Sequence, residues 1–314
     1  MSPSDRAAGI LRAGAHGRVE RDHAVGPLTS YGLGGDAAVF LEAEGDQDLS
    51  ALARALEETG LPLLMVGRGS NMLVSDRGFS GVAVRLGAGF RWTRVEGSHI
   101  EAGAGVPLPS VAVLSGQHSL AGLEFAIAIP ASVGGAVRMN AGAHGHSVGE
   151  VLHEVDVFRI ASAARERIPA GQLGFSYRTT DLPADAVVVG AEFELKPGDG
   201  SEIKAKLREA RDWRRANQPL NLPNAGSVFK NPPGDAAGRI IEQVCGKGLR
   251  VGGAQISEIH ANFIVASAGA RADDVYTLIR RIQRRVKEET GIELEPEVRL
   301  VGDFEEVEDG APAR

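Results

Sequence analysis

The spacing of apolar residues predicts that strands and helices alternate along the first part of the chain. Residues 37–43 and 63–66 are short apolar runs typical of buried strands. Between them, residues 46–60 place apolar side chains on one face of a helix. A loop at 67–71 and a third apolar run at 72–74 follow. The opening is therefore a strand–helix–strand unit that leads into a candidate ligand loop.

The best-patterned segment lies near the other end, where residues 272–290 carry one apolar stripe and Gly291 supplies a helix stop. We expect this stripe to lie in a hydrophobic core rather than against a cofactor, because surface helices bury one apolar face. Its members are Val275, Leu278, Ile279, Ile282 and Val286.

The rest of the chain mixes β-prone runs, glycine-rich segments and helical patterns. We expect short strands within 82–104, a helix at 111–117, strands at 151–160 and 186–195, and a turn at 197–200. Helices at 202–217 and 236–245 and a strand at 296–301 should follow, before an acidic tail from Asp303. The pattern predicts a mixed α/β protein, class α+β, with a domain boundary at the turn.

Composition narrows the possible partners and compartment. The formal net charge is −7, from 34 lysines and arginines against 41 acidic residues, and no basic run is long enough for a nucleic-acid footprint. The single cysteine, Cys245, excludes an internal disulfide and fits a reducing compartment. Without an apolar signal segment or membrane span, we expect a cytoplasmic protein that binds no membrane, with a monomer as the default.

Several familiar chemistries lack their motifs. The glycine spacings of a Rossmann fingerprint and of a P-loop are incomplete, and neither a G-x-S-x-G elbow nor an H-E-x-x-H pair occurs. His144, His146 and His153 are close in sequence but have no carboxylate or cysteine at a convincing ligand spacing. We therefore expect no metal site.

Two glycine-rich loops remain as candidates for binding an anion, because glycine lets backbone N–H groups approach a diphosphate. The residues are Gly67, Arg68, Gly69, Ser70 and Asn71 in the first loop, and Ile129, Pro130, Ala131, Ser132, Gly134 and Gly135 in the second. The pair resembles the diphosphate-binding loops of the vanillyl-alcohol oxidase and p-cresol methylhydroxylase flavoproteins. Many of those oxidases carry a flavin-linked histidine after the first loop, whereas this chain has Asn71, so the resemblance implies non-covalent FAD.

The resemblance narrows to the UDP-N-acetylenolpyruvoylglucosamine reductase family through motifs spread from about Thr29 to Gly302. The most specific is residues 224–232, Asn-Ala-Gly-Ser-Val-Phe-Lys-Asn-Pro; the others are residues 122–125, 139–142, 177–178, 252–255 and 294–298. Ala131 and Thr180 depart from the usual glycine and serine. The 49 positions from Arg178 to Ser227 leave little room for the insertion of the longer subtype, so the chain is similar to the shorter one.

This resemblance implies a two-subdomain FAD-binding module of the vanillyl-alcohol oxidase type and a smaller α/β substrate-binding domain. The expected divisions are a leader at 1–28, whose order the sequence leaves open, FAD-binding subdomains at 29–86 and 87–198, a substrate-binding domain at 199–293, and a returning strand and tail at 294–314.

The implied reaction uses NADPH and FAD to reduce the enolpyruvyl group of a UDP-sugar, in peptidoglycan precursor synthesis. By the same resemblance Arg178 holds the substrate carboxylate and the developing enolate. Glu297, if kept protonated, donates a hydrogen bond or relays a proton, and Ser227 donates the proton to carbon. Without the family, Ser227 would be read as a turn residue after Gly226.

Substrate contacts are expected from Tyr177, Lys230, Asn231, Arg215 and Gln218, since ammonium and carboxamide groups bind phosphate and hydroxyl oxygens. Two other interpretations stay open. One is a flavin-dependent oxidase or dehydrogenase of the same superfamily, and the other is a non-catalytic UDP-sugar-binding protein.

Overall fold

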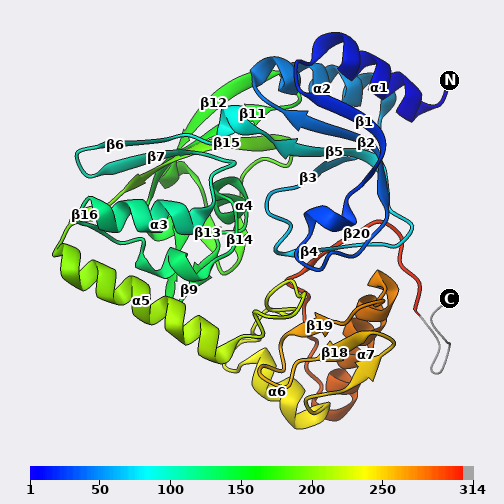
Figure 1. The fold of residues 1–314 in the computed structure, drawn as a ribbon, viewed down its shortest axis with the longest axis vertical. Coiled ribbons are helices and arrows are strands. Elements are labelled where there is room, and N and C mark those ends of the chain that lie inside the picture. Colours follow the sequence, from blue (N-terminus) through cyan, green and yellow to red (C-terminus); the bar gives the residue numbers. More distant parts are fainter. Residues whose placement is uncertain (307–314) are drawn as a thin grey trace. The chain divides into compact units, whose positions relative to one another are not determined.

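The computed structural model describes residues 1–306 and confirms the mixed α/β class (Figure 1). The helices are α1 (Pro3–Gly14), α2 (Asp46–Thr59), α3 (Leu108–Gln117), α4 (Val133–Arg138), α5 (Gly200–Asn217), α6 (Ala237–Val244) and α7 (Ala272–Thr290). The first strands are β1 (Arg18–Ala24), β2 (Asp36–Ala43), β3 (Leu63–Met65), β4 (Met72–Val74), β5 (Phe79–Leu86), β6 (Thr93–Glu96), β7 (His99–Gly103), β8 (Leu120–Ala121), β9 (Gly142–Ala143) and β10 (His146–Ser147). The later strands are β11 (Leu152–Arg159), β12 (Ala164–Pro169), β13 (Phe175–Ser176), β14 (Thr179–Thr180), β15 (Ala186–Glu194), β16 (Lys196–Pro197), β17 (Arg250–Val251), β18 (Ala254–Ile256), β19 (Ile264–Ala266) and β20 (Arg299–Val301).

The chain forms two compact units, which do not follow the boundaries expected from the sequence. Unit 1 comprises 1–21, 39–68 and 81–214, and unit 2 comprises 22–38, 69–80 and 215–314. The turn at 197–200 lies within unit 1, and a domain boundary there stays a prediction. Helix α5 stays with unit 1 because Ile203 and Leu207 are buried in its core. Two segments from the first half of the chain belong to unit 2, where Tyr31 and Leu73 are core residues.

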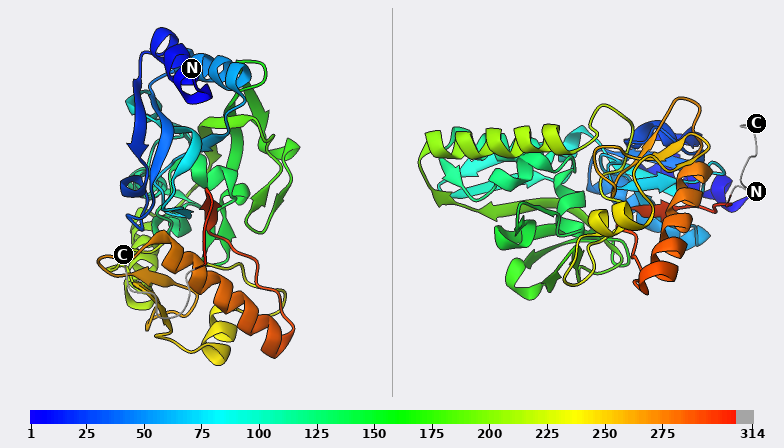
Figure 2. Two further views of the ribbon diagram at one scale, coloured as in Figure 1. Left: turned by 90° about the vertical axis from the view of Figure 1, so that its right-hand side faces the viewer. Right: turned by 90° about the horizontal axis from the view of Figure 1, so that it is seen from below.

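The leader, whose order the sequence left open, forms a regular helix. Ser2 caps α1 in a reciprocal capping box with Asp5. Ala7, Ala8 and Leu11 are buried in one core with α2, and the two helices lie side by side (Figures 1 and 2). The apolar stripe of α1 spans too few turns to stand out in the sequence.

Unit 1 contains two larger sheets. Most of a four-stranded sheet, in the order β1-β2-β5-β3, lies with α1 and α2, and a five-stranded antiparallel sheet has the order β12-β11-β15-β7-β6. Helices α3 and α4 contact strands of the second sheet, and α5 runs beside α3 (Figure 2). On its other face, Val187 and Val189 of β15 join the core formed with α1 and α2. Strand β15 reads as continuously apolar because this half of it is buried on both faces.

Unit 2 is built on the three-stranded antiparallel sheet β17-β18-β19, with α6 and α7. The predicted α7 stripe is confirmed as core, since all five of its members are fully buried, and Gly291 ends the helix with a φ of 75°. The strand expected at 296–301 is shorter, because only Arg299–Val301 pairs with β4, in parallel.

The acidic tail begins as an ordered segment. Glu305 forms an ion pair with Arg77, Glu306 lies 2.6 Å from Arg284, and the ring of Phe304 stacks on Tyr276 at 4.8 Å. The remainder of the predicted tail, 307–314, lies outside the described residues. Within 1–306, no helix is long and apolar enough to cross a membrane.

Candidate functional site

The start of the first glycine-rich loop, residues 67–68, is adjacent to the second loop in unit 1, although 62 positions separate Arg68 from Pro130. Arg68 Nε donates to Pro130 O at 3.1 Å. A Cβ atom on Gly67 would lie 2.6 Å from Ser132 Oγ, so a larger residue there would have to displace this hydroxyl. The structure therefore brings together the start of the first loop and the middle of the second.

The second loop uses part of its backbone internally, contrary to the expectation that its glycine amides face an anion. Ser132 caps α4 by accepting from Gly135 N at 3.3 Å, and Gly134 N donates to Ala104 O at 3.0 Å. A Cβ on Gly134 would lie only 2.9 Å from that of Ala104. Gly134 thus serves close packing, while Gly135 is exposed.

The neighbouring residues of this loop also anchor it. Ile129 and Ala131 pack against the core of unit 1. Ala131 O accepts from Leu108 N at 2.9 Å, at the start of α3. Ala131 departs from the family pattern, and its methyl group packs against the core of unit 1.

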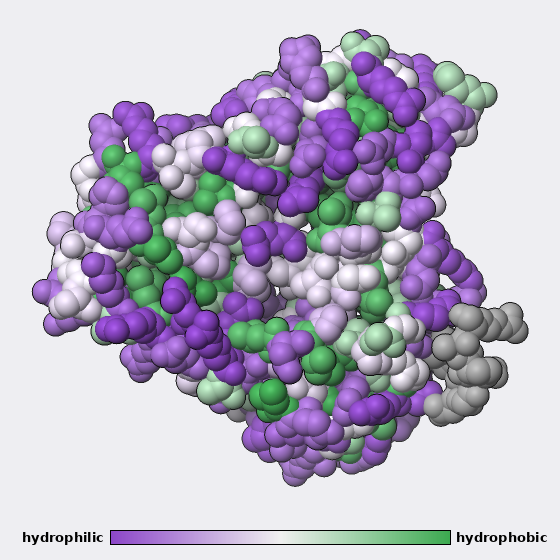
Figure 3. Space-filling view, viewed as in Figure 1, coloured by the Kyte–Doolittle hydropathy of each residue, from purple (hydrophilic) through white to green (hydrophobic). Residues whose placement is uncertain are grey.

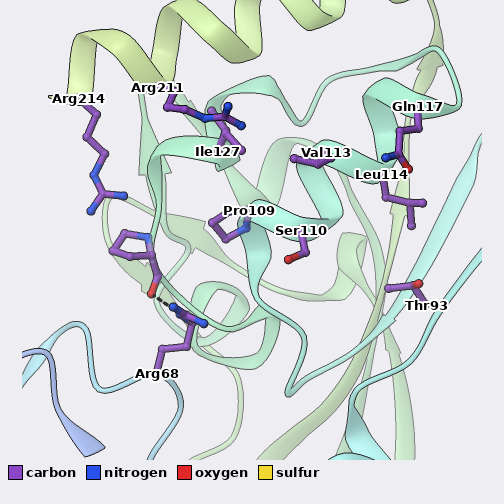
Figure 4. Close-up of a pocket in the computed structure, with 11 residues that line it drawn as sticks. Arg68, Thr93, Pro109, Ser110, Val113, Leu114, Gln117, Ile127, Arg211 and Arg214 are labelled. Atoms are coloured by element: carbon purple, nitrogen blue, oxygen red, sulfur yellow. Dashed lines mark hydrogen bonds between the residues drawn. The ribbon is translucent and has the colours of Figure 1, made fainter.

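A cavity of about 630 Å³ in unit 1 is bordered by this loop and by α3 and α5. Figure 4 shows Arg211 and Arg214 reaching from α5 and Arg68 on the other side, bonded to Pro130. Figure 3 shows apolar side chains gathered over α3, beside the polar side chains of α5. Burial lowers the pKa of Arg214. Three guanidinium groups around an apolar floor suit a phosphorylated ligand with an aromatic part.

The sequence analysis did not single out Arg211 and Arg214. The available signal was their three-residue spacing within a predicted helix, which places two cations on one face. That spacing is common on solvent-exposed helices and does not by itself indicate a site. Only the position of α5 beside the second loop shows that the two arginines line a cavity.

Arg178 lies at the tip of a two-residue turn between β13 and β14, where Ser176 pairs with Thr179. Its φ is 58°, in the left-handed region that costs free energy for residues with a side chain. Its Nη1 donates to Gly142 O at 2.8 Å, and its guanidinium lies 5.4 Å from the ring of Tyr177, which is 55% exposed.

Asn140 supports this hairpin. It is 6% exposed, has a φ of 43°, and its Nδ2 donates to Ser176 O at 2.9 Å. Its Oδ1 accepts from Gly149 N at 2.9 Å. The sequence analysis quoted Asn140 only within a motif and missed this role; a signal was present, since asparagine tolerates the left-handed conformation after a helix.

Ser227 is held in unit 2 by its neighbours. Gly226 precedes it with a φ of 75°, and Val228 N donates to Asn262 O at 2.8 Å. The Asn262 side chain accepts from Phe229 N at 3.0 Å and donates to Phe229 O at 2.8 Å. Asn262, 4% exposed, clamps the segment after Ser227 and was not foreseen from the sequence.

Glu297 lies on the opposite side of this segment. Its N donates to Val228 O at 2.8 Å, and its O accepts from Asn71 Nδ2 at 3.0 Å. Lys230 N donates to Glu295 O at 2.9 Å, and Lys230 Nζ lies 2.6 Å from Glu295 Oε1. The structure thus brings the end of the first loop, the Ser227 segment and Glu297 together within unit 2.

Ser30 was not predicted to matter but links two of these parts. Its N donates to Gly69 O at 3.0 Å, and its Oγ donates to Asn224 O at 2.6 Å. Gly69 has a φ of 63°, and a Cβ there would meet Leu28 O at 2.2 Å, so this position requires glycine. Ser70 follows it half-buried.

The weaker substrate candidates are placed differently. Asn231 Oδ1 accepts from Ala237 N at 3.0 Å at the start of α6, so this carbonyl has a structural use. Arg215 is exposed at the end of α5, and Gln218 is half-buried just after it. Arg178 and Tyr177 belong to unit 1, whereas Ser227, Glu297, Lys230, Asn231, Arg215 and Gln218 belong to unit 2.

Comparison with known proteins gives concordant matches. Residues 37–162 match a family described as an FAD binding domain, and residues 218–301 match the C-terminal domain of UDP-N-acetylenolpyruvoylglucosamine reductase. UDP-N-acetylenolpyruvoylglucosamine reductase 2 of Symbiobacterium thermophilum is 43% identical over 304 residues, 96% of this chain and 98% of that protein. The reductase of Anaeromyxobacter sp. strain Fw109-5 is 44% identical over 289 residues, 92% of this chain and 90% of that protein.

A solved structure agrees in fold. The crystal structure of the reductase from Thermus caldophilus matches with a TM-score of 0.79 and 37% identity, covering 91% of this chain and 100% of that one.

Proposed function

This chain belongs to the UDP-N-acetylenolpyruvoylglucosamine reductase family, and from that premise we propose that Arg178, Ser227 and Glu297 carry out its reaction. The chain is an FAD-dependent oxidoreductase that uses NADPH to reduce UDP-N-acetylglucosamine enolpyruvate to UDP-N-acetylmuramate, in peptidoglycan precursor synthesis. The observation that carries the residue assignment is the pairing of the Ser227 and Glu297 segments through Glu297 N and Val228 O, at 2.8 Å.

The residues present fit FAD. Because Gly67 has no Cβ, its backbone approaches Ser132 closely. Gly67 itself is exposed, so a ligand can reach the loop from that side. Arg68 and Arg214 add positive charge at the neighbouring cavity. We assign residues 67–71 and 129–135 to holding the cofactor, without a covalent bond because Asn71 is not a nucleophile. When bound, FAD supplies hydride acceptance from NADPH and hydride delivery to the terminal carbon of the enolpyruvyl double bond.

Hydride addition to the terminal enolpyruvyl carbon builds negative charge on the neighbouring carbon and its carboxylate. Arg178 carries the positive charge that can stabilise it. A fixed guanidinium that binds this charge more tightly in the transition state than in the substrate lowers the barrier. The left-handed turn and the bond to Gly142 O fix the backbone and the guanidinium before substrate arrives. We assign to Arg178 the binding of the carboxylate and of the developing enolate.

Ser227 donates its hydroxyl proton to the carbanionic carbon. A serine hydroxyl is a weak acid, so it needs either a nearby cation or a strongly basic acceptor. Lys230 Nζ is 2.6 Å from Glu295 Oε1, which balances the lysine charge. This pairing favours direct protonation of a basic carbanion over activation of Ser227 by Lys230.

Glu297 completes the proposed set. Its backbone is fixed on both sides, by Val228 O and by Asn71 Nδ2, so its side chain has a defined origin next to the Ser227 segment. In its protonated form it donates a hydrogen bond to the enolate or returns a proton to Ser227. A charged carboxylate would oppose the developing negative charge.

Finer points belong to the same proposal. Lys230 and Tyr177 bind the UDP-sugar, with Asn231, Arg215 and Gln218 as further contacts. The enzyme works as a monomer in the cytoplasm, without nucleic-acid or membrane partners. Support comes from the net charge of −7 and from the single free Cys245, which fits a reducing compartment.

An anaerobic half-reaction tests the proposal. The purified flavoprotein is reduced with one equivalent of NADPH, UDP-N-acetylglucosamine enolpyruvate is added, and flavin absorbance is followed. Rapid return of oxidised flavin is expected, and Ser227→Ala should slow only this phase, by about 10²–10⁴-fold.

Ser267→Ala is the matched control, because this exposed hydroxyl donates to the local Gly253 O at 3.0 Å and lies outside the proposed site. If the flavin stays reduced until oxygen enters, the oxidase interpretation replaces the reductase. If it is never reduced by NADPH although the UDP-sugar binds, the chain is a binding protein.

A further inference from the structure

One face of the five-stranded sheet in unit 1 carries polar side chains that the proposed reaction does not use. Val187 and Val189 of β15 are covered by the core with α1 and α2, but beyond them the strand continues with Glu192 and Glu194. The β15 neighbours are β7 on one side and β11 on the other (Figure 1). The open part of this face therefore spans the middle three strands.

Three potential metal ligands meet there, one from each strand. His99 of β7 lies opposite Glu194, next to Glu192 of β15. In β11 the register shifts between Leu152, opposite Phe193, and Glu154, opposite Glu192, so His153 is the additional residue at an irregularity. Such a bulge re-aims a side chain.

The distances suit a small ion. His99 Nδ1 lies 2.7 Å from Glu192 Oε1, and the rings of His99 and His153 stand edge to face with centroids 5.1 Å apart. One ligand atom from each of the three residues lies within 4.8 Å of the others. Metal–ligand bonds of about 2.0–2.2 Å require the three ligand atoms to lie closer together than this. Rotation of the His153 side chain, which is 47% exposed, can bring its ring nitrogen closer to the other two.

The surroundings favour a cation. A cavity of about 280 Å³ opens beside His99 and Glu192. The five strands carry more carboxylates than arginines: besides Glu192 they hold Glu96, Glu101, Glu154, Asp156, Glu166 and Glu194, against Arg94, Arg159, Arg165 and Arg167. All four arginines are already paired: Arg94 with Glu96 at 3.0 Å, Arg159 with Asp185 at 2.8 Å, Arg165 with Asp46 at 2.6 Å and Arg167 with Glu154 at 2.7 Å.

We propose that His99, His153 and Glu192 bind a divalent transition-metal ion, with Zn²⁺ as the best fit. Two imidazoles and one carboxylate are ligands for zinc, and two nitrogen donors disfavour Mg²⁺ and Ca²⁺. Water fills the fourth position. The ion ties β7, β15 and β11 together, so it stabilises unit 1 in the folded state and leaves the reductase chemistry unchanged.

This site departs from the expectation of no metal, which compared only histidines close in sequence. The structure separates those residues. His144 stands edge-on to Trp213 at 5.1 Å, and His146 Nδ1 lies 2.9 Å from Glu150 Oε2. Only His153 joins the cluster, with partners from two other strands.

Isothermal titration of the chelator-treated holoenzyme with Zn²⁺ tests the site, alongside His153→Gln, Glu192→Gln and the control His146→Gln. His146 is a matched control because it is an exposed histidine paired with one glutamate. We expect one Zn²⁺ per chain in the wild type and in His146→Gln, and affinity at least about tenfold weaker in both ligand variants. Saturating Zn²⁺ should raise the melting temperatures of the wild type and of His146→Gln but not those of the two ligand variants. Mg²⁺ should raise the melting temperature of none of the four proteins.

His153→Gln changes an exposed side chain, so it should fold, and circular dichroism checks this. Its reductase activity should equal that of the wild type. Absence of a stoichiometric site in the wild type, or wild-type Zn²⁺ affinity in His153→Gln or in Glu192→Gln, would overturn the proposal.

Discussion

Two regions that carry proposed catalytic residues are built differently, although each uses a left-handed turn. The hairpin 175–180 holds Arg178 with two residue pairs between its short strands and with bonds to Ser176 O and Gly142 O. The segment 227–230 holds Ser227 between the 295–298 backbone on one side and the buried Asn262 on the other.

Because of this difference, changes near the hairpin should mainly affect the position of Arg178, whereas changes near Ser227 should also affect the stability of the fold. The hairpin is mostly exposed and depends on a few side-chain hydrogen bonds, so losing one should displace Arg178 at little cost to the fold. The Ser227 segment lies in the core of unit 2, where Val228 and Phe229 are buried. Changes there should lower stability and activity together.

After Ser227→Ala, the largest effect is expected for Arg178→Gln. Loss of a charged donor at the developing enolate should reduce the rate of flavin reoxidation by substrate by about 10²–10³-fold, or about 2.7–4 kcal/mol. Its urea unfolding midpoint should stay near the wild-type value. Stopped-flow absorbance measures the rate, and Arg94→Gln, an exposed arginine paired with Glu96, is the control. An equally slow control would show that surface charge, not position, matters.

Asn262→Ala should lower the free energy of unfolding, unlike Arg178→Gln in the hairpin. It leaves the buried N–H and C=O of Phe229 without their side-chain partner, at about 1–3 kcal/mol for each group. Urea denaturation should show this loss, and reoxidation should slow as Ser227 loses its support. A wild-type urea midpoint in Asn262→Ala would contradict the clamp.

Asn140→Gly should change activity with a smaller effect on stability. Glycine adopts the φ of 43° without strain, so this variant removes the bond to Ser176 O and the bond from Gly149 N while keeping the backbone conformation. We expect kcat to fall about tenfold, equivalent to about 1.4 kcal/mol. NADPH reduction of the flavin should be unchanged. A wild-type kcat would show that the hairpin holds Arg178 without Asn140.

The smallest effect is a pH dependence in unit 2. Burial, with Lys247 nearby, lowers the pKa of His260 below its usual 6.5, and its Nδ1 accepts from Asn262 N at 3.1 Å. The folded state therefore binds fewer protons than the unfolded state, so stability is complete above the usual pKa and falls as the pH drops towards the folded value.

Urea midpoints at about pH 7.5 and about pH 5.5 measure this loss, which should stay near or below about 1.4 kcal/mol. His260→Gln should flatten the dependence. An unchanged pH profile in that variant would assign the loss to other groups.

The sequence predicted elements best where the local pattern was long. Helix α7 was expected at 272–290 and occupies those residues, because five turns of one apolar stripe and a terminal glycine leave little ambiguity. Helix α1 and hairpin 175–180 were missed, because their short apolar or β-prone runs become stable only against α2 and against the 140–149 segment. The domain boundaries stay a prediction, since local turns do not reveal which core buries a helix.

The sequence by itself determined the alternation of elements, the glycine-rich loops and the identity of the groups that the reaction needs. These follow from side-chain periodicity, from backbone conformations that favour glycine, and from motifs within short segments. Only the tertiary structure decided that Asn140 and Asn262 support Arg178 and Ser227, and that His99, His153 and Glu192 share one face. Those contacts join strands and loops far apart along the chain, and they depend on strand register and on a bulge that no local pattern specifies.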